Sequence, residues 1–286
     1  MKMGGKAQSL QKLQNAGFNV PPFFTCDSSW GEEKILQTLE KKLSNTKYFA
    51  VRSSASGEDE EKKSYAGHFY SAVGVTRGDV FKEVQKVLTS FGDLEGSVII
   101  QEFIPSDVSG VTFSDNGEGV VVINSNFGLC KNVVEGKACD EYIVQKDGVL
   151  IRKSISQDKP VLTFHSGSLD ERVSGDESLT NDQLKRVVEL ANQSEEYFKK
   201  PQDIEWCFQG DILYLLQSRP VTESIEIPEQ VYFDSANIAE SYSGIVLPLT
   251  ASFAERIYKV VYTDFLRMSG VPKRILRKHA YVFENL

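Results

Sequence analysis

The stretch QDIEWCFQGDILYLLQSRP, residues 202–220, constrains the fold of this chain more than any other segment. Two short apolar runs flank a Gly-Asp pair, which is the pattern of a β-hairpin. Successive strand residues point to opposite faces, so Glu205 lies on the face away from Trp206, while Gln217 and Arg219 share one face of the second strand. These polar groups on an otherwise apolar hairpin need an explanation.

The length of the hairpin loop decides whether the polar groups meet. A three-residue loop, 209–211, places Glu205 opposite Leu215 and diagonal to Gln217, whereas a two-residue loop pairs Glu205 with Tyr214 and puts Gln217 on the wrong side. We therefore predict a three-residue loop. It gathers a carboxylate, an amide carbonyl and the guanidinium of Arg219, which suits a divalent metal ion and the phosphates it bridges. An edge hairpin with a solvated polar face accounts for this stretch equally well.

Composition limits the classes of partner. The 286 residues carry 32 basic and 40 acidic side chains, and the resulting net charge of -8 argues against a general nucleic-acid or anionic-membrane surface. No apolar run approaches the roughly 20 residues that span a bilayer, and the opening MKMGGKAQSL lacks the apolar core of a signal peptide. The four cysteines show no CxxC spacing that would indicate a zinc site. We expect a cytoplasmic protein that binds neither nucleic acid nor membranes.

Hydrophobic periodicity predicts mixed helices and strands without internal repeats. Helices are expected at 5–16, after a capping box at 29–32, at 80–91, after a second capping box at 180–183, and at 250–268. Strands are expected at 48–51, 97–103, 110–113, 119–123 and 141–144. The acidic, proline-containing stretch after Pro220 is typical of a linker.

Residues 50–75 indicate a second element able to hold phosphate. A strand delivers Arg52 into SSASGEDE, a run too polar and too small to pack. Small residues let the backbone approach a ligand, and serine hydroxyls with backbone N–H groups hold phosphate oxygens. A solvated, flexible loop has the same composition, so this segment does not decide the matter by itself.

Six segments, in order, resemble the ATP-binding domain of the family of phosphoenolpyruvate synthase, pyruvate phosphate dikinase and rifampin phosphotransferase. They are GGKAQSLQKLQNAGFNVPPFF, VRSSASGED, SYAGHFYSAVGV, VIIQEFIPSDVSGVTF, GLCKNVVEGKACDEYIV and PQDIEWCFQGDILYLLQSRPVT. The resemblance spans about residues 4–222 and implies an α+β ATP-grasp fold, whose two lobes clamp the nucleotide. It places the N-terminal lobe at 1–109, the C-terminal lobe at 110–222, and a linker with the truncated, helical start of a next domain at 223–286.

The resemblance implies roles for residues around the phosphates of ATP. Lys6 of GGK and Arg52 of VRSS would contact the phosphates. Gly67, Ser71 and Ala72 would form the loop over the phosphates. Lys6 by itself would be read as a solvated lysine near the terminus, so its role depends on the resemblance.

The remaining roles fall on two strands. Gln101 sits where the family places an adenine-side or hinge contact, although a polar edge-strand residue would look the same. Glu205 and Gln217 would hold Mg²⁺, and Arg219 would stabilise the transferring phosphoryl group. The implied activity is that of a dikinase-type transferase, which passes a phosphoryl group from ATP to a histidine on a swivelling domain and leaves AMP.

Two features depart from the family pattern. GLCK stands where the family has GLGE, so Cys130 replaces a glycine and Lys131 an acidic residue. His68, His165 and His279 all lack the TSHxA-like setting of the phosphohistidine, so the swivel domain and the substrate domain are expected to be separate partners or parts of a longer protein. The alternative is a non-catalytic ATP-grasp module with a regulatory or assembly role.

Overall fold

The structure is a computed structural model that describes residues 4–55, 69–92 and 94–221, together with Met268. Contacts within the chain divide it after residue 225, and apart from Met268 all described residues belong to the first unit. The predicted linker and start of a next domain at 223–286, which include the predicted helix at 250–268, lie outside the described residues except for Met268. Within the described part, no helix combines the length and the apolarity that crossing a bilayer requires.

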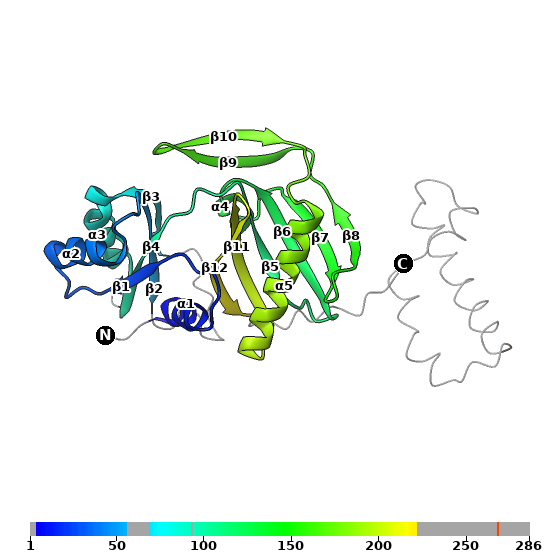
Figure 1. Cartoon of the computed structure of the whole chain (residues 1–286), viewed down its shortest axis with the longest axis horizontal. Helices are drawn as coiled ribbons and strands as arrows, with labels where there is room; N and C mark the ends of the chain where they lie inside the picture. The colour runs from blue at the N-terminus through cyan, green and yellow to red at the C-terminus, as the bar shows by residue number, and fades with distance from the viewer. Residues whose placement is uncertain (1–3, 56–68, 93, 222–267, 269–286) are drawn as a thin grey trace, which may run out of the picture. The chain divides into compact units, whose positions relative to one another are not determined.

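A small antiparallel sheet with strand order β1-β4-β2-β3 forms the first layer (Figure 1). Its strands are β1 (Phe23–Cys26), β2 (Tyr48–Ala55), β3 (Ala72–Thr76) and β4 (Gly96–Glu102). Helix α2 (Glu32–Lys42) and helix α3 (Val80–Ser90), which follows the short 3-10 helix η1 (Arg77–Asp79), bury their apolar stripes against one face of this sheet. The opposite face carries Arg52, because its β2 neighbour Val51 lies in the core beneath the helices.

A larger antiparallel sheet has strand order β12-β11-β5-β6-β7-β8 (Figure 1). Its strands are β5 (Val108–Phe113), β6 (Val120–Phe127), β7 (Asp140–Gln145), β8 (Leu150–Ser154), β11 (Gln202–Gln209) and β12 (Ile212–Pro220). Helices α1 (Gly5–Asn15) and α5 (Asn181–Phe198) pack on one face, in a core built around Trp206. Glu205 therefore lies on the face that these helices leave open.

Three further elements complete the described chain. The short helix α4 (Lys131–Val134) follows β6, and β9 (Lys159–His165) pairs with β10 (Ser168–Ser174) as a separate two-stranded sheet. Figure 1 shows this hairpin extending past the edge of the larger sheet towards β3.

The elements confirm the α+β class, and two separate lobes built on two sheets are the arrangement expected of an ATP-grasp domain. The predicted strands and the helices at 5–16 and 80–91 are present within one or a few residues. The second capping box is also confirmed, since Thr180 and Gln183 exchange side-chain-to-backbone hydrogen bonds. The lobe boundaries stay a prediction.

The first predicted capping box is wrong. Helix α2 begins at Glu32 with Gly31 as its N-cap and no side-chain cap. The carboxylate of Asp27 accepts hydrogen bonds from both the backbone N–H and the hydroxyl of Ser29, so a local turn engages the residue that was expected to cap the helix. The strands β8 and β10 escaped prediction because all but one of their residues are exposed and they show no buried apolar face.

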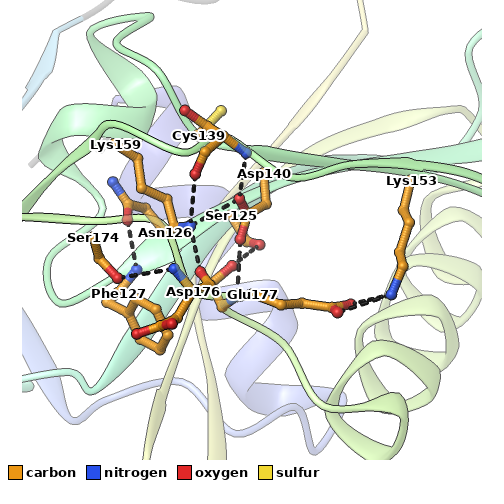
Figure 2. A network of polar contacts seen from close by, with 12 residues as sticks. Ser125, Asn126, Phe127, Cys139, Asp140, Lys153, Lys159, Ser174, Asp176 and Glu177 are labelled. Atoms are coloured by element: carbon orange, nitrogen blue, oxygen red, sulfur yellow. Dashed lines mark hydrogen bonds and ion pairs between the residues drawn. The ribbon is translucent and has the colours of Figure 1, made fainter.

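A buried ion pair fastens the base of the β9–β10 hairpin to the larger sheet (Figure 2). Lys159 and Asp140 have fully buried side chains, and Lys159 Nζ lies 3.0 Å from Asp140 Oδ1. The ammonium also donates to the carbonyls of Ser156 and Asp176, while Asp140 accepts the backbone N–H groups of Ser156 and Ser178 at 3.1 and 2.8 Å. Both charges are thereby compensated and hydrogen-bonded, which is the condition for burying them.

We predict that Lys159→Met destabilises the fold by about 3–5 kcal/mol, because it leaves the Asp140 carboxylate buried without its countercharge. The midpoint of urea unfolding measures this loss. The matched control is Lys153→Met on β8, since Lys153 pairs with Glu177 at 2.8 Å in an exposed position and its removal should cost at most about 1 kcal/mol. Equal losses for the two variants would show that the buried pair contributes nothing particular.

We further predict that stability falls between about pH 10 and pH 12 through Tyr142. Burial in the core, aided by the negative charge of Asp140, raises the pKa of this phenol to about 12. The unfolded chain loses this proton near pH 10 and the folded chain holds it, so the free energy of unfolding falls by up to about 1.4 kcal/mol per pH unit in this window. Tyr142→Phe should flatten the dependence measured by urea titrations, and an unchanged slope would contradict the assignment.

Candidate functional site

The β11–β12 hairpin turns through two residues, Gly210 and Asp211, because Gln209 pairs directly with Ile212. The predicted three-residue loop is therefore wrong. Gly210 has a φ of +55°, a backbone conformation that two-residue hairpin turns favour and that glycine adopts without strain. The glycine permits a tighter turn than strand alternation alone suggested.

A β-bulge nevertheless brings the predicted polar groups together. The register shifts beside Glu205, so that Trp206 pairs with Leu215 while Glu205 pairs with Gln217. Leu216 is the extra residue of the bulge. Without the bulge, a two-residue turn at Gly210 and Asp211 would place Glu205 opposite Leu216, and not opposite Tyr214 as expected from the sequence, and it would turn Gln217 towards the core. The bulge thus puts the carboxylate and the amide on the same open face.

Arg52 reaches this face from the small sheet. Its Nη2 donates to Glu205 Oε2 at 2.8 Å, and its Nη1 donates to the backbone carbonyl of Leu216 at 3.2 Å. The side chains of Arg52 and Glu205 are 24% and 16% exposed, so water screens this ion pair only partly. The bulge residue therefore supplies a second acceptor for the arginine that joins the two sheets.

Asp203 is a site residue that the sequence analysis missed. It lies opposite Arg219, which donates through Nε at 2.8 Å and places Nη2 2.7 Å from the same oxygen, Oδ2. Burial raises the pKa of the Asp203 carboxyl, Arg219 counteracts this effect, and the charge of Glu205 adds to it. The signal was present in the sequence, since Asp203 precedes Glu205 by two residues and shares its face.

Cys130 lies next to this cluster of charges. Its thiol donates to the carbonyl of Gly110 at 3.3 Å. Burial raises the pKa of the Cys130 thiol well above its ordinary value, and the charge of Glu205 raises it further. The thiol is therefore protonated at neutral pH. Cys130, which stands where the family has a glycine, therefore lies near Glu205, the proposed metal ligand.

The structure places Lys6 near the strand that carries Arg52. Lys6 lies in the first turn of α1, and the backbone N–H of the next residue, Ala7, donates to Ser54 Oγ at 3.1 Å. Ser54 follows Arg52 by two residues in β2 and so shares its face. The helix start and the arginine are therefore positioned by the same strand.

The other predicted residues are more scattered. Gln101 is buried in β4 on the face of Arg52, and its Nε2 donates to the carbonyl of Pro21 at 3.3 Å. Ser71 is exposed just before β3. Ala72 is the first residue of β3, not part of a loop, and packs against the core beneath α2 and α3. Gly67 lies outside the described residues.

Of the three histidines, the structure describes only His165. It is exposed at the end of β9, beside the hairpin turn. His68 and His279 lie outside the described residues.

The profile of the family described as pyruvate phosphate dikinase, AMP/ATP-binding domain, matches residues 32–95 and 90–239. The chain belongs to this family. The matched residues include β2, which carries Arg52, and the whole β11–β12 hairpin.

Several curated proteins are similar to the chain. A rifampicin phosphotransferase of Bacillus subtilis is 29% identical over 63% of this chain, and a probable phosphoenolpyruvate synthase of Pyrococcus horikoshii is 31% identical over 61%. The prodigiosin synthesizing transferase PigC of Serratia marcescens is 26% identical over 94% of this chain. The chain spans 24%, 26% and 39% of the lengths of these three relatives, respectively.

Solved structures similar to the chain include a D-alanine–D-alanine ligase from Bacillus anthracis, with 11% identity and a TM-score of 0.44 over 75% of this chain and 55% of that one. The D-cycloserine synthetase DcsG is 12% identical, with a TM-score of 0.41 over 81% of this chain and 66% of that one.

The donor set at the bulge fits a divalent cation that a nucleotide helps to hold. Within the described ranges, no three histidine, cysteine, aspartate or glutamate side chains are arranged as a metal cage. Glu205 and Gln217 instead offer one carboxylate and one amide carbonyl side by side. Mg²⁺ is usually bound by one or two such ligands together with substrate phosphates and water, so the residues present fit this ion.

Proposed function

We propose that this chain is the ATP-binding module of a phosphotransferase that passes a phosphoryl group from ATP to a histidine on a separate swivelling domain and leaves AMP. The observation that carries the proposal is the junction at the bulge, where Arg52 from one sheet contacts Glu205, which is paired with Gln217 on the other. Placed cations beside a carboxylate and a carbonyl are the groups that phosphoryl transfer requires. The proposal places the chain in the cytoplasm, where ATP is available.

Glu205 and Gln217 are the residues that would hold Mg²⁺, whose charge would neutralise the phosphates of bound ATP. Arg52 can exchange its present acceptors, Glu205 and the Leu216 carbonyl, for phosphate oxygens, because its planar guanidinium offers several donors. Glu205 is then available to the cation. Lys6, Ser71 and Gly67 are proposed to contact the phosphates, Ala72 to support that segment from β3, and Gln101 to act near the adenine.

Arg219 is proposed to stabilise the phosphoryl group in transfer. Asp203 holds two nitrogens of its guanidinium and so fixes the orientation of the fork. Preorganised donors of this kind lower the barrier because they need no rearrangement as charge develops. Asp203 acts through Arg219 in this scheme and is a positioning residue.

A second candidate function is a nucleotide-binding module without catalysis, in a regulatory or assembly role. The observation that favours it is Cys130, a half-buried thiol near the charge of Glu205, where the family pattern has a glycine. Binding of ATP without transfer to any histidine domain would decide for this alternative. The chain spans only part of the length of its relatives. We therefore propose, on the resemblance to the family, that a swivel domain, a substrate domain and the phosphoryl acceptor act with it.

We predict that Glu205→Gln weakens ATP binding on the order of tenfold to a hundredfold in the presence of Mg²⁺, but does not weaken it in EDTA. The amide keeps the shape of the side chain and removes the charge that attracts the cation. Isothermal titration with ATP under both conditions measures the difference.

The matched control is Glu195→Gln, because Glu195 is a similarly shielded carboxylate, paired with Lys146 at 2.6 Å on the helix-covered side of the sheet. It should leave both titrations unchanged. Loss of ATP affinity in EDTA as well, or the same loss in both variants, would reject the metal role of Glu205.

We predict that Arg219→Lys retains most of the ATP affinity but slows phosphoryl transfer on the order of a hundredfold to a thousandfold, because lysine lacks the planar fork. The measurement is AMP formation and acceptor labelling with a histidine-bearing domain supplied in trans, alongside an ATP titration. Arg152→Lys, on the exposed strand β8, is the control. Transfer at the wild-type rate would reduce Arg219 to a structural partner of Asp203.

A further inference from the structure

The β9–β10 hairpin belongs neither to the small sheet nor to the larger one, yet β9 is largely buried. Leu162 and Phe164 are both buried, whereas every residue of β10 is exposed except the last, which is intermediate. Alternate strand residues share a face, so Leu162 and Phe164 point to the same side. They form a separate core cluster with Ala50, Phe103 and Leu129, which come from other parts of the fold.

Phe164 joins the hairpin to the small sheet. Its ring meets those of Tyr48 and Phe103 edge-on, each with 4.9 Å between ring centroids. Tyr48 is the first residue of β2, the strand that carries Arg52, and Phe103 directly follows β4. Edge-to-face aromatic pairs have a preferred geometry, so they fix orientation as well as contact.

Gly74 in β3 forms the third wall around Phe164. Its φ is +68°, and a Cβ atom at this position would lie 2.4 Å from the Phe164 ring. Only a residue without a side chain leaves room for the aromatic ring here. The small sheet is therefore shaped to receive the hairpin.

Leu162 joins the same strand to the loop beside the candidate site. Its carbonyl accepts the N–H of Leu129 at 2.7 Å, and a Cβ atom on Gly128 would lie 2.1 Å from that carbonyl oxygen. Leu129 directly precedes Cys130, whose thiol donates to Gly110 of β5, the strand that pairs with β11. Two residues of one strand thus contact the small sheet and the site loop, and the Lys159–Asp140 pair anchors the base of that strand in the larger sheet (Figure 2).

We propose that the β9–β10 hairpin is a strut that sets the position of the small sheet against the larger one, and that Phe164 is its positioning residue. The hairpin thereby holds β2, the strand that carries Arg52, in position against β11, the strand that carries Glu205. The effect of the hairpin on ATP binding rests on the proposed function, whereas its effect on the position of the small sheet does not.

The test compares Phe164→Ala, Phe164→Leu and the control Val173→Ala in the full chain. Val173 lies on β10 and is 65% exposed, so its truncation removes apolar atoms from the same hairpin without touching the small sheet. Hydrogen exchange without nucleotide reports on β2 and β3, with α5 as the internal measure of global folding. Phe164→Ala should raise exchange in β2 and β3 about tenfold or more while α5 stays protected. Phe164→Leu should restore most of the protection.

The same variants are titrated with ATP and Mg²⁺. Phe164→Ala should lower the affinity about tenfold, a usual size for coupling between distant sites, and Phe164→Leu should recover it. If the wild-type chain fails to bind ATP, the proposed function fails and the exchange data still judge the strut. Exchange in β2 and β3 equal to that of Val173→Ala overturns the strut. In a chain that binds ATP, increased exchange with unchanged ATP affinity overturns the effect of the strut on the ATP site.

Gly74→Ala keeps the proposal testable if Phe164→Ala fails to fold. Because the new methyl group meets the Phe164 ring, Phe164→Leu should offset part of the damage from Gly74→Ala, and the double variant should exchange more slowly in β3 than additivity predicts. Additive behaviour of the two substitutions would overturn the role of this contact.

Discussion

The contact between Arg52 and the bulged strand pair is the constraint on which the site depends. A single extra residue, Leu216, turns Gln217 to the side of Glu205 and leaves a carbonyl for Arg52. The arginine then joins β2 of the small sheet to β11 and β12 of the larger one. A bulge is costly within a regular ladder, and its position beside the polar cluster is typical of strands that direct side chains for function.

Charge is distributed unevenly around this junction. Two carboxylates, Asp203 and Glu205, stand two residues apart on one strand, and each has its own arginine. Neighbouring carboxylates repel each other, and the guanidinium that each one accepts from offsets this repulsion in a partly buried position. A nucleotide that draws Arg52 away would leave Glu205 with surplus negative charge, and a divalent cation would restore the balance. Metal and nucleotide binding are thus expected to support each other.

The neighbourhood of Cys130 connects the departure from the family pattern to the mechanics of the fold. Gly128 is retained because the Leu162 carbonyl fills the space that a side chain would need. Cys130, two residues later, packs a protonated thiol against Gly110 beside the charged cluster. A glycine at this position would leave the loop with more freedom, so the cysteine favours a rigid loop whose position follows that of the β9–β10 hairpin.

The sequence by itself determined the α+β class, most strands and helices, the capping box at Thr180 and the presence of Glu205 and Gln217 on one face of the hairpin, because these follow from local periodicity and side-chain chemistry. Only the tertiary structure decided how these two residues reach the same face. The choice between a three-residue loop and a two-residue turn with a bulge depends on how β11 packs against β5 and on the contact with Arg52. The tertiary structure alone also showed Asp203 as the partner of Arg219, and Phe164 at the junction with the small sheet. Such contacts join residues far apart in the chain, and no local pattern records them.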